Sequence, residues 1–312
     1  MHRLLRPLAA MAGLIAALAG PAPVRAQAQA SAADGAPRQG FVWQATRGDR
    51  QLVLVATIHA APPGLTSVPA GVPTLLAGAQ ALAVEADTRR QDALAQAVQR
   101  HGMLPADAPD LWQRLPAPLA DRTRAALRRL GLQEAAFARM QPWMLTVTLA
   151  TVELARAGFD PEAGSEIRLL GMAAQAGRPV IELEGTELQL SLFARMAPAM
   201  QAAMLERLLD QLDDGTASRE LAQLSAAWRD GSSLQMDAVI DRMTADAARH
   251  PADRLVAEDL LVARHPALLD AIEQAAARHS PLMVAVGALH WFGPQGLRQG
   301  LRGRGWTVHE AP

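Results

Sequence analysis

Two histidines stand at matching positions in two similar stretches of the chain. His59 follows the apolar run of residues 52–55, and His290 follows the apolar run of residues 282–286. Near neutral pH an imidazole can bind a metal ion or transfer a proton. The two histidines are therefore the first candidates for chemistry.

Acidic residues stand at two further predicted strand ends. Glu85 follows the apolar run of residues 81–84, and Glu184 closes a later strand that begins at Pro179. Histidine and glutamate together are ligands for a divalent metal such as Zn, Mn or Co. A metal with three protein ligands and an open position would ionise a bound water near neutral pH.

Each histidine belongs to a unit in which strand, turn, helix, strand and acid follow one another. The acid comes 26 residues after His59, at Glu85, and 20 residues after His290, at Glu310. We interpret the two units as an internal duplication, although two histidine-bearing turns can also arise by chance. Ligands of open α/β sheets bind at the C-terminal ends of the strands, where both histidines are expected. Glu310 lies two residues from the terminus and is left out of the predicted site.

The elements around these units predict an α/β fold. We expect a central sheet, mostly parallel or mixed, built from two related βαβ-like halves. Helical periodicity predicts large insertions at about residues 88–158 and 196–279. Residues 40–312 are predicted to form a single domain, which begins with a hairpin that turns at residues 47–49.

Composition excludes several classes of chemistry. The chain has no cysteine and no tyrosine, all 30 of its basic residues are arginine, and its net charge is −1. Schiff-base and P-loop lysines, cysteine nucleophiles, disulfides and tyrosine acids are therefore absent. No basic patch with interleaved aromatic residues indicates nucleic-acid binding, and no nucleotide cofactor is expected.

The N-terminus has the pattern of a secretory signal peptide over residues 1–30, followed by a polar linker at residues 31–39. Two arginines precede the apolar residues 8–19, and Ala-x-Ala cleavage sites occur within residues 26–30. The apolar run is too short to span a bilayer comfortably, although an uncleaved anchor remains the alternative. We expect a periplasmic or secreted protein with no membrane span after cleavage.

The chain resembles the TraB/GumN family, which is related to the Tiki membrane proteases and, more distantly, to erythromycin-esterase and ChaN-like proteins. The resemblance rests on residues 56–62, 84–87, 164–190, 261–264 and 284–297. Two departures stand out. Ala56 replaces the glycine of the family's first Gly-x-x-His motif, and His265 replaces the asparagine that usually follows Arg264. The second departure puts any role of that asparagine side chain in doubt.

The resemblance implies a metal-dependent hydrolase that acts on a peptide or amide bond. Together with the duplication, it leads us to predict His59, His290 and Glu85 as metal ligands. The predicted catalytic residues are Glu85, Glu184 and Arg264. A glutamate outside the ligand set would act as general base, and the arginine would bind a substrate carboxylate or a developing oxyanion. Without the resemblance, Arg264 would be interpreted as a surface helix residue.

The alternative is a non-enzymatic periplasmic binding or accessory protein linked to polysaccharide or peptide signalling. If no metal binds, the same side chains would form a hydrogen-bonded His-Glu-Arg network in a binding pocket. The partner would be a peptide or a small molecule, and the oligomeric state is not predicted. A serine esterase ranks low because the chain has no Gly-x-Ser-x-Gly elbow, and no His-Glu-x-x-His zinc helix occurs either.

Other polar residues are given structural roles. Ser165 is predicted to cap a helix whose first turn gains a favourable charge from Glu166. His250, His265 and His279 lie at helix ends or beside prolines, where surface caps are more frequent than ligands.

Overall fold

The computed structural model describes residues 39–311, so the predicted signal peptide and all but the last residue of the linker lie outside the described part. One mixed six-stranded sheet has the order β4-β3-β5-β2-β1-β6, and the predicted α/β class is confirmed. The strands are β1 (Val42–Arg47), β2 (Arg50–Thr57), β3 (Ala81–Val84), β4 (Val180–Glu182), β5 (Leu282–Gly287) and β6 (Thr307–Glu310).

Four neighbouring strands of the sheet, β4, β3, β5 and β2, run parallel. Strand β1 is antiparallel to β2, as the predicted hairpin requires, and β6 is antiparallel to β1. Strands β3 and β5 are buried along their whole length. Their continuous apolar sequence fits this position, because a parallel strand with helices on both faces needs apolar side chains on both sides.

The two histidine-bearing units occupy related positions in the sheet. Strand β2 of the first unit lies beside β5 of the second, with Leu52 opposite Leu282 and Thr57 opposite Gly287. Helix α1 (Val72–Gly78) packs on one face, together with α6 (Ser165–Gln175). Helix α13 (Leu297–Gly303) packs on the other face, together with α12 (His265–Ala276). The arrangement is not fully symmetric, because β3 pairs directly with β5 whereas β1 separates β2 from β6.

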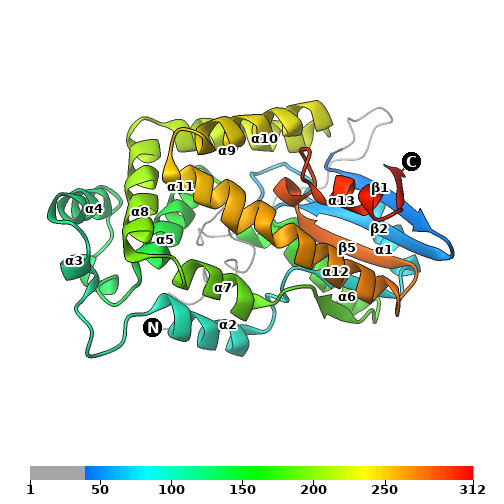
Figure 1. The fold of residues 1–312 in the computed structure, drawn as a ribbon, viewed down its shortest axis with the longest axis horizontal. Coiled ribbons are helices and arrows are strands. Elements are labelled where there is room, and N and C mark those ends of the chain that lie inside the picture. Colours follow the sequence, from blue (N-terminus) through cyan, green and yellow to red (C-terminus); the bar gives the residue numbers. More distant parts are fainter. Residues whose placement is uncertain (1–38, 312) are drawn as a thin grey trace.

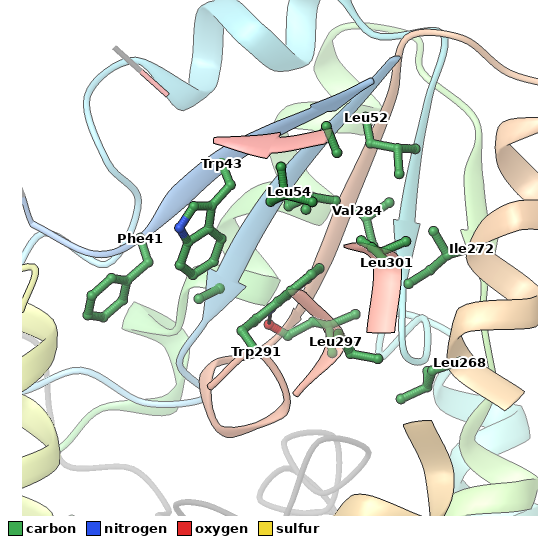
Figure 2. Close-up of a cluster of buried hydrophobic side chains, with 14 of the residues drawn as sticks. Phe41, Trp43, Leu52, Leu54, Leu268, Ile272, Val284, Trp291, Leu297 and Leu301 are labelled. Atoms are coloured by element: carbon green, nitrogen blue, oxygen red, sulfur yellow. Dashed lines mark hydrogen bonds between the residues drawn. The ribbon is translucent and has the colours of Figure 1, made fainter. Parts of the chain in front are cut away.

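The face covered by α12 and α13 holds the largest apolar cluster. Figure 2 shows Trp43 and Trp291 among aliphatic side chains from β2, β5 and the two helices. Phe41 stacks on Trp43 with ring centroids 5.9 Å apart. The indole of Trp291 donates a hydrogen bond to Val286 O at 2.8 Å. This bond and the surrounding packing hold the turn after β5, in which His290 lies.

Most helices lie at the opposite end of the molecule from the sheet (Figure 1). Between β3 and β4 the chain forms α2 (Gln91–Ala97), a π-helix (Val98–Gly102), α3 (Leu111–Arg114), α4 (Ala117–Arg129), a 3-10 turn (Glu134–Ala136), α5 (Pro142–Arg156), a 3-10 turn (Pro161–Ala163) and α6 (Ser165–Gln175). Within residues 39–311, no helix has both the length and the apolar character needed to cross a bilayer.

A second helical segment connects β4 to β5. It comprises α7 (Thr186–Ala194), α8 (Pro198–Asp213), α9 (Thr216–Arg229), α10 (Ser233–Ala247), α11 (Pro251–Arg254), a π-helix (Leu255–Leu261), a 3-10 turn (Val262–Arg264) and α12 (His265–Ala276). Short π-helical segments occur frequently at functional sites. Here the π-helix leads directly into Arg264, the arginine that the family resemblance singles out.

Candidate functional site

The parallel strands end at one edge, where His59, Glu85 and His290 come together. Gly287, the last residue of β5, marks their meeting point. A Cβ placed on it would lie 3.2 Å from Glu85 Oε1, 3.6 Å from His59 Nε2 and 3.7 Å from His290 Cδ2. His59 Nε2 and His290 Cδ2 therefore lie no farther apart than the sum of the last two distances. The structure thus brings the three predicted metal ligands into one place.

His59 is anchored by Glu166, a contact that the sequence analysis missed. Its Nδ1 lies 3.0 Å from Glu166 Oε2, and both side chains are buried. Ser165 joins the start of α6 to the turn after β2, because its Oγ accepts a hydrogen bond from Ile58 N at 2.7 Å. Gly164 permits this approach, since a Cβ there would lie only 2.5 Å from His59 O. The expected capping role of Ser165 is therefore wrong: its hydroxyl binds another segment.

Charge and burial act in opposite directions on this pair. Burial alone would lower the pKa of His59, but the hydrogen bond and the charge of Glu166 outweigh it and raise that pKa above its usual value. Burial raises the pKa of Glu166, against the opposing effect of His59. The pair therefore holds a proton more readily than an exposed histidine does.

His290 is anchored differently, through His265. His265 Nδ1 lies 2.7 Å from Gln295 O, and its Nε2 lies 3.0 Å from His290 Nδ1. A carbonyl oxygen only accepts, so Nδ1 of His265 carries the hydrogen and, in the neutral ring, Nε2 accepts from His290 Nδ1–H. His290 Nε2 is then left with a free lone pair, 3.7 Å from Glu85 Oε2.

Burial favours the neutral form of both rings. It lowers the pKa of His265, and it lowers that of His290 to about 3 despite the nearby carboxylate of Glu85. His265 is buried, so the expectation of a surface cap is wrong at this position. No local sequence signal revealed its role, because its partners lie in the turn around His290, 25 and 30 residues farther along the chain.

Arg264 holds the two predicted catalytic glutamates. Its Nη2 donates to Glu85 Oε2 at 2.8 Å and also to Glu184 Oε2, and its Nε donates to Glu184 Oε1 at 2.9 Å. Its Nη1 donates to Leu260 O at 3.1 Å. These contacts use four of the five guanidinium N–H groups. Gln189, a second residue not foreseen from sequence, donates to both carboxylates at 3.1 Å.

Glu85 stays ionised in this buried setting. Burial alone would raise its pKa, but the charges of His290 and Arg264 outweigh it and lower the pKa to about 2. Because His290 is neutral near pH 7, Arg264 supplies the positive charge there. The backbone N–H of Gly287 adds a hydrogen bond to Glu85 Oε1 at 2.8 Å. Burial works against the charge of Arg264, yet Glu184 and Glu85 raise its pKa.

The site opens into a small cavity of about 50 Å³, whose polar lining includes His59, Glu85, Arg264 and His290. A space of this size holds a few water molecules. Among residues 39–311, no three side chains of His, Cys, Asp or Glu are already arranged to hold a metal ion. All five predicted site residues nevertheless border this cavity or contact a residue that does.

Comparison with known proteins identifies the family. The sequence profile of the TraB/PrgY/gumN family matches residues 41–310. A protein of Escherichia coli K12 named "Uncharacterized protein YbaP" is 26% identical over 255 residues, which are 82% of this chain and 89% of the relative. Its counterpart of the same name in Shigella flexneri matches equally well. No solved structure matches the chain. Since the family profile spans nearly the whole described chain, the protein belongs to the TraB/PrgY/gumN family.

Proposed function

We propose that the protein is a metal-dependent hydrolase that cleaves a peptide or other amide bond. The observation that carries this proposal is the orientation of the two histidines. Each has Nδ1 bound to a buried partner, Glu166 or His265, while Nε2 is left for a ligand near Glu85. Metal-binding histidines typically have one ring nitrogen fixed in this way by a second group.

The donor set suits a divalent cation such as Zn, Mn or Co. His59, His290 and Glu85 would hold it, a two-histidine, one-carboxylate set used by zinc hydrolases. As they stand, these side chains in the described part of the chain do not enclose an ion position. Support for the proposal is therefore the donor chemistry and the partners of the two rings. A bound cation would supply a water that ionises near neutral pH.

The remaining polar residues position the donors. Glu166 fixes the ring of His59 and favours its Nδ1–H form. Arg264 keeps Glu85 ionised and holds Glu184 beside it. Because most of its N–H groups are bound within the protein, we assign Arg264 to positioning and not to substrate binding. Glu184 is bonded to both Arg264 and Gln189, and we assign it the same role.

Metal content measured on protein purified without chelator tests the proposal. We expect one equivalent of metal by inductively coupled plasma mass spectrometry, and loss of most of it in His59→Ala and in His290→Ala. His309→Ala is the matched control, because His309 is exposed on β6. Circular dichroism shows whether the variants fold. Unchanged metal content in both site variants would refute the proposal.

A binding protein is the second candidate, and one observation favours it. The carboxylates of Glu85 and Glu184 are already bonded to Arg264 and Gln189 without any ion. This function predicts a folded, metal-free protein whose stability does not change on addition of Zn, Mn or Co. Thermal unfolding with and without each metal separates the two candidates, because a ligand that binds only the folded state raises the melting temperature.

We also propose that the protein is exported, with a signal peptide removed within residues 26–30. The support is the charged, apolar and small-residue order of residues 1–30. N-terminal sequencing of protein purified from the periplasm or medium tests this proposal. A first residue at Met1 would refute cleavage.

A further inference from the structure

A second and larger cavity lies next to the site. Its volume is about 340 Å³, within the size range of small-molecule pockets. Helices α5, α8, α9 and α10 and the π-helix Leu255–Leu261 form its walls. Most of the side chains that line it are apolar, among them Val147, Phe193, Met204, Leu208 and Val256. We call this cavity the helical chamber.

The helical chamber adjoins the cavity of the site. Leu221, Leu224 and Leu289 line both spaces. Leu289 directly precedes His290, so one of the shared walls belongs to the same turn as the histidine. Leu221 is half-buried and belongs to none of the hydrophobic clusters of the core. The leucines that line both cavities are therefore the boundary that a molecule in the chamber would cross to reach the histidines.

The side chains that line the chamber also include seven polar ones: Thr146, Arg207, Gln211, Glu220, Arg242, Asp246 and Asp253. Arg207 pairs with Asp253 at 2.9 Å, and Asp246 and Glu220 line the same cavity. Burial raises the pKa of Glu220, and the neighbouring carboxylates of Asp246 and Asp253 raise it further. In the apolar part, the buried Thr146 hydroxyl already donates to Pro142 O at 3.0 Å. The walls are helical, so their backbone groups are already hydrogen-bonded and offer few partners to a peptide backbone.

We propose that the helical chamber binds the aliphatic chain of an amphiphilic amide, whose polar group reaches the His59–His290 cavity. The mostly apolar walls suit a hydrocarbon chain, and the three shared leucines show that the chamber lies next to the cavity of the two histidines. This inference names a substrate class for the proposed hydrolase and rests on that function for its catalytic part. Binding of the chain itself does not need a metal.

Competition binding to the full chain tests the chamber without relying on catalysis. The probe is N-phenyl-1-naphthylamine, a neutral apolar fluorophore, with EDTA present throughout. N-acylglycines with acyl chains of increasing length compete with it. We expect affinity to rise up to about fourfold for each added methylene, since each buried methylene contributes about 0.8 kcal/mol. An affinity that does not depend on chain length would overturn the proposal.

Two variants locate the binding. Leu221→Trp and Ala217→Phe place bulk in the chamber and should weaken binding of the long-chain competitor at least tenfold. Ala222→Phe on the same helix is the control, because Ala222 is exposed and does not line the cavity. Equal weakening in the control would place the binding elsewhere. A leucine-rich peptide that competes better than every acylglycine would assign the chamber to a peptide and refute the aliphatic chain.

The two proposals fail in different ways. A metal-free protein that still binds acylglycines according to chain length would refute the hydrolase and leave the chamber proposal standing. A protein that takes up metal through His59 and His290 but ignores chain length would refute only the chamber. Metal content and competition binding are therefore measured on the same preparations.

Discussion

The surroundings of His59 and His290 differ, although the two histidines hold matching places in two related units. His59 is bonded to a carboxylate, Glu166, which raises its pKa. His290 is bonded to a second imidazole, His265, and burial lowers its pKa to about 3. One ring therefore tends to hold a proton, whereas the other stays neutral.

This difference comes from the helices that pack on the units. Glu166 belongs to α6, which follows β3 and precedes β4 along the chain. His265 begins α12, which follows β4 and precedes β5 along the chain. The two strands supply the backbone positions of the histidines, and the inserted segments supply their partners. Matching positions in the two units can thus acquire different protonation through what packs against them.

Removing the carboxylate of Glu85 should have the largest effect. Glu85→Ala leaves Arg264 buried with one carboxylate fewer and frees the N–H of Gly287. We expect a loss of about 3–5 kcal/mol in the free energy of unfolding, as for other broken buried ion pairs. Urea unfolding measures it. Glu187→Ala is the control: its carboxylate is about half exposed, and we expect a change below about 1 kcal/mol. A similarly small loss for Glu85→Ala would contradict the buried network.

The two histidines should give opposite dependences of stability on pH. The folded pKa of His290 lies below its unfolded value of about 6.5, so the unfolded chain takes up the proton first. The stability linked to His290 is complete above pH 6.5 and falls, by up to about 1.4 kcal/mol per pH unit, as the pH drops toward 3. The raised pKa of His59 has the other sign, with stability present below pH 6.5 and lost as the pH rises through the folded pKa.

Urea unfolding in EDTA at several pH values between 5 and 8 measures both contributions. We expect His290→Gln to flatten the loss of stability on acidification below pH 6.5, and His59→Gln to flatten the loss of stability as the pH rises above 6.5. Glu85 does not interfere in this range, because the stability linked to its lowered pKa is lost only below about pH 4.5. Equal slopes in the two variants would show that the rings do not differ in protonation.

Conservative changes of the two partners sharpen the comparison further. Glu166→Gln keeps an acceptor for His59 but removes its charge, so burial should then lower the pKa of His59. His265→Asn keeps an acceptor for Nδ1–H of His290, which should remain neutral. Titration of the histidine rings by NMR reports both. The comparison fails if the asparagine variant shifts its histidine as much as the glutamine variant does.

The smallest expected effect concerns the residues that open each His motif. Gly287→Ala should cost little in the backbone, because its φ of −51° and ψ of 139° suit alanine. Its new Cβ would crowd Glu85 Oε1 at 3.2 Å and should lower metal uptake. Ala56→Gly should cost about 1 kcal/mol through backbone entropy and leave uptake unchanged. Metal content and urea unfolding of both variants check this, and unchanged uptake in Gly287→Ala would show that its Cβ is tolerated.

Much of the sheet could be predicted because its strands are continuous apolar runs. Residues 52–55, 81–84 and 282–286 lie in β2, β3 and β5. The edge shared by the two histidines followed from the general position of ligands in parallel sheets. Insertion of β1 between β2 and β6 could not be foreseen, because periodicity reveals a strand but not its neighbour.

The partners of the histidines could not be predicted for a related reason. Glu166 and Ser165 contact residues 107 positions earlier in the chain. The local sequence pattern predicted a helix start for these two residues and a helix terminus for His265. All three residues do lie at the start of a helix, but tertiary contacts decide what their side chains do. Gly164 marks this contact in the sequence, because a residue with a Cβ at this position could not lie so close to His59.

The position of β5 determines when this protein can fold during synthesis. Strand β5 separates β3 from β2, and it begins only at Leu282, far along the chain from both. A growing polypeptide therefore lacks the middle of its sheet until Leu282 and the residues after it have been synthesised. Contacts between residues so distant in sequence also form slowly. Nascent chains should consequently expose the edges of β2 and β3, and any protein released before Leu282 should aggregate or be degraded.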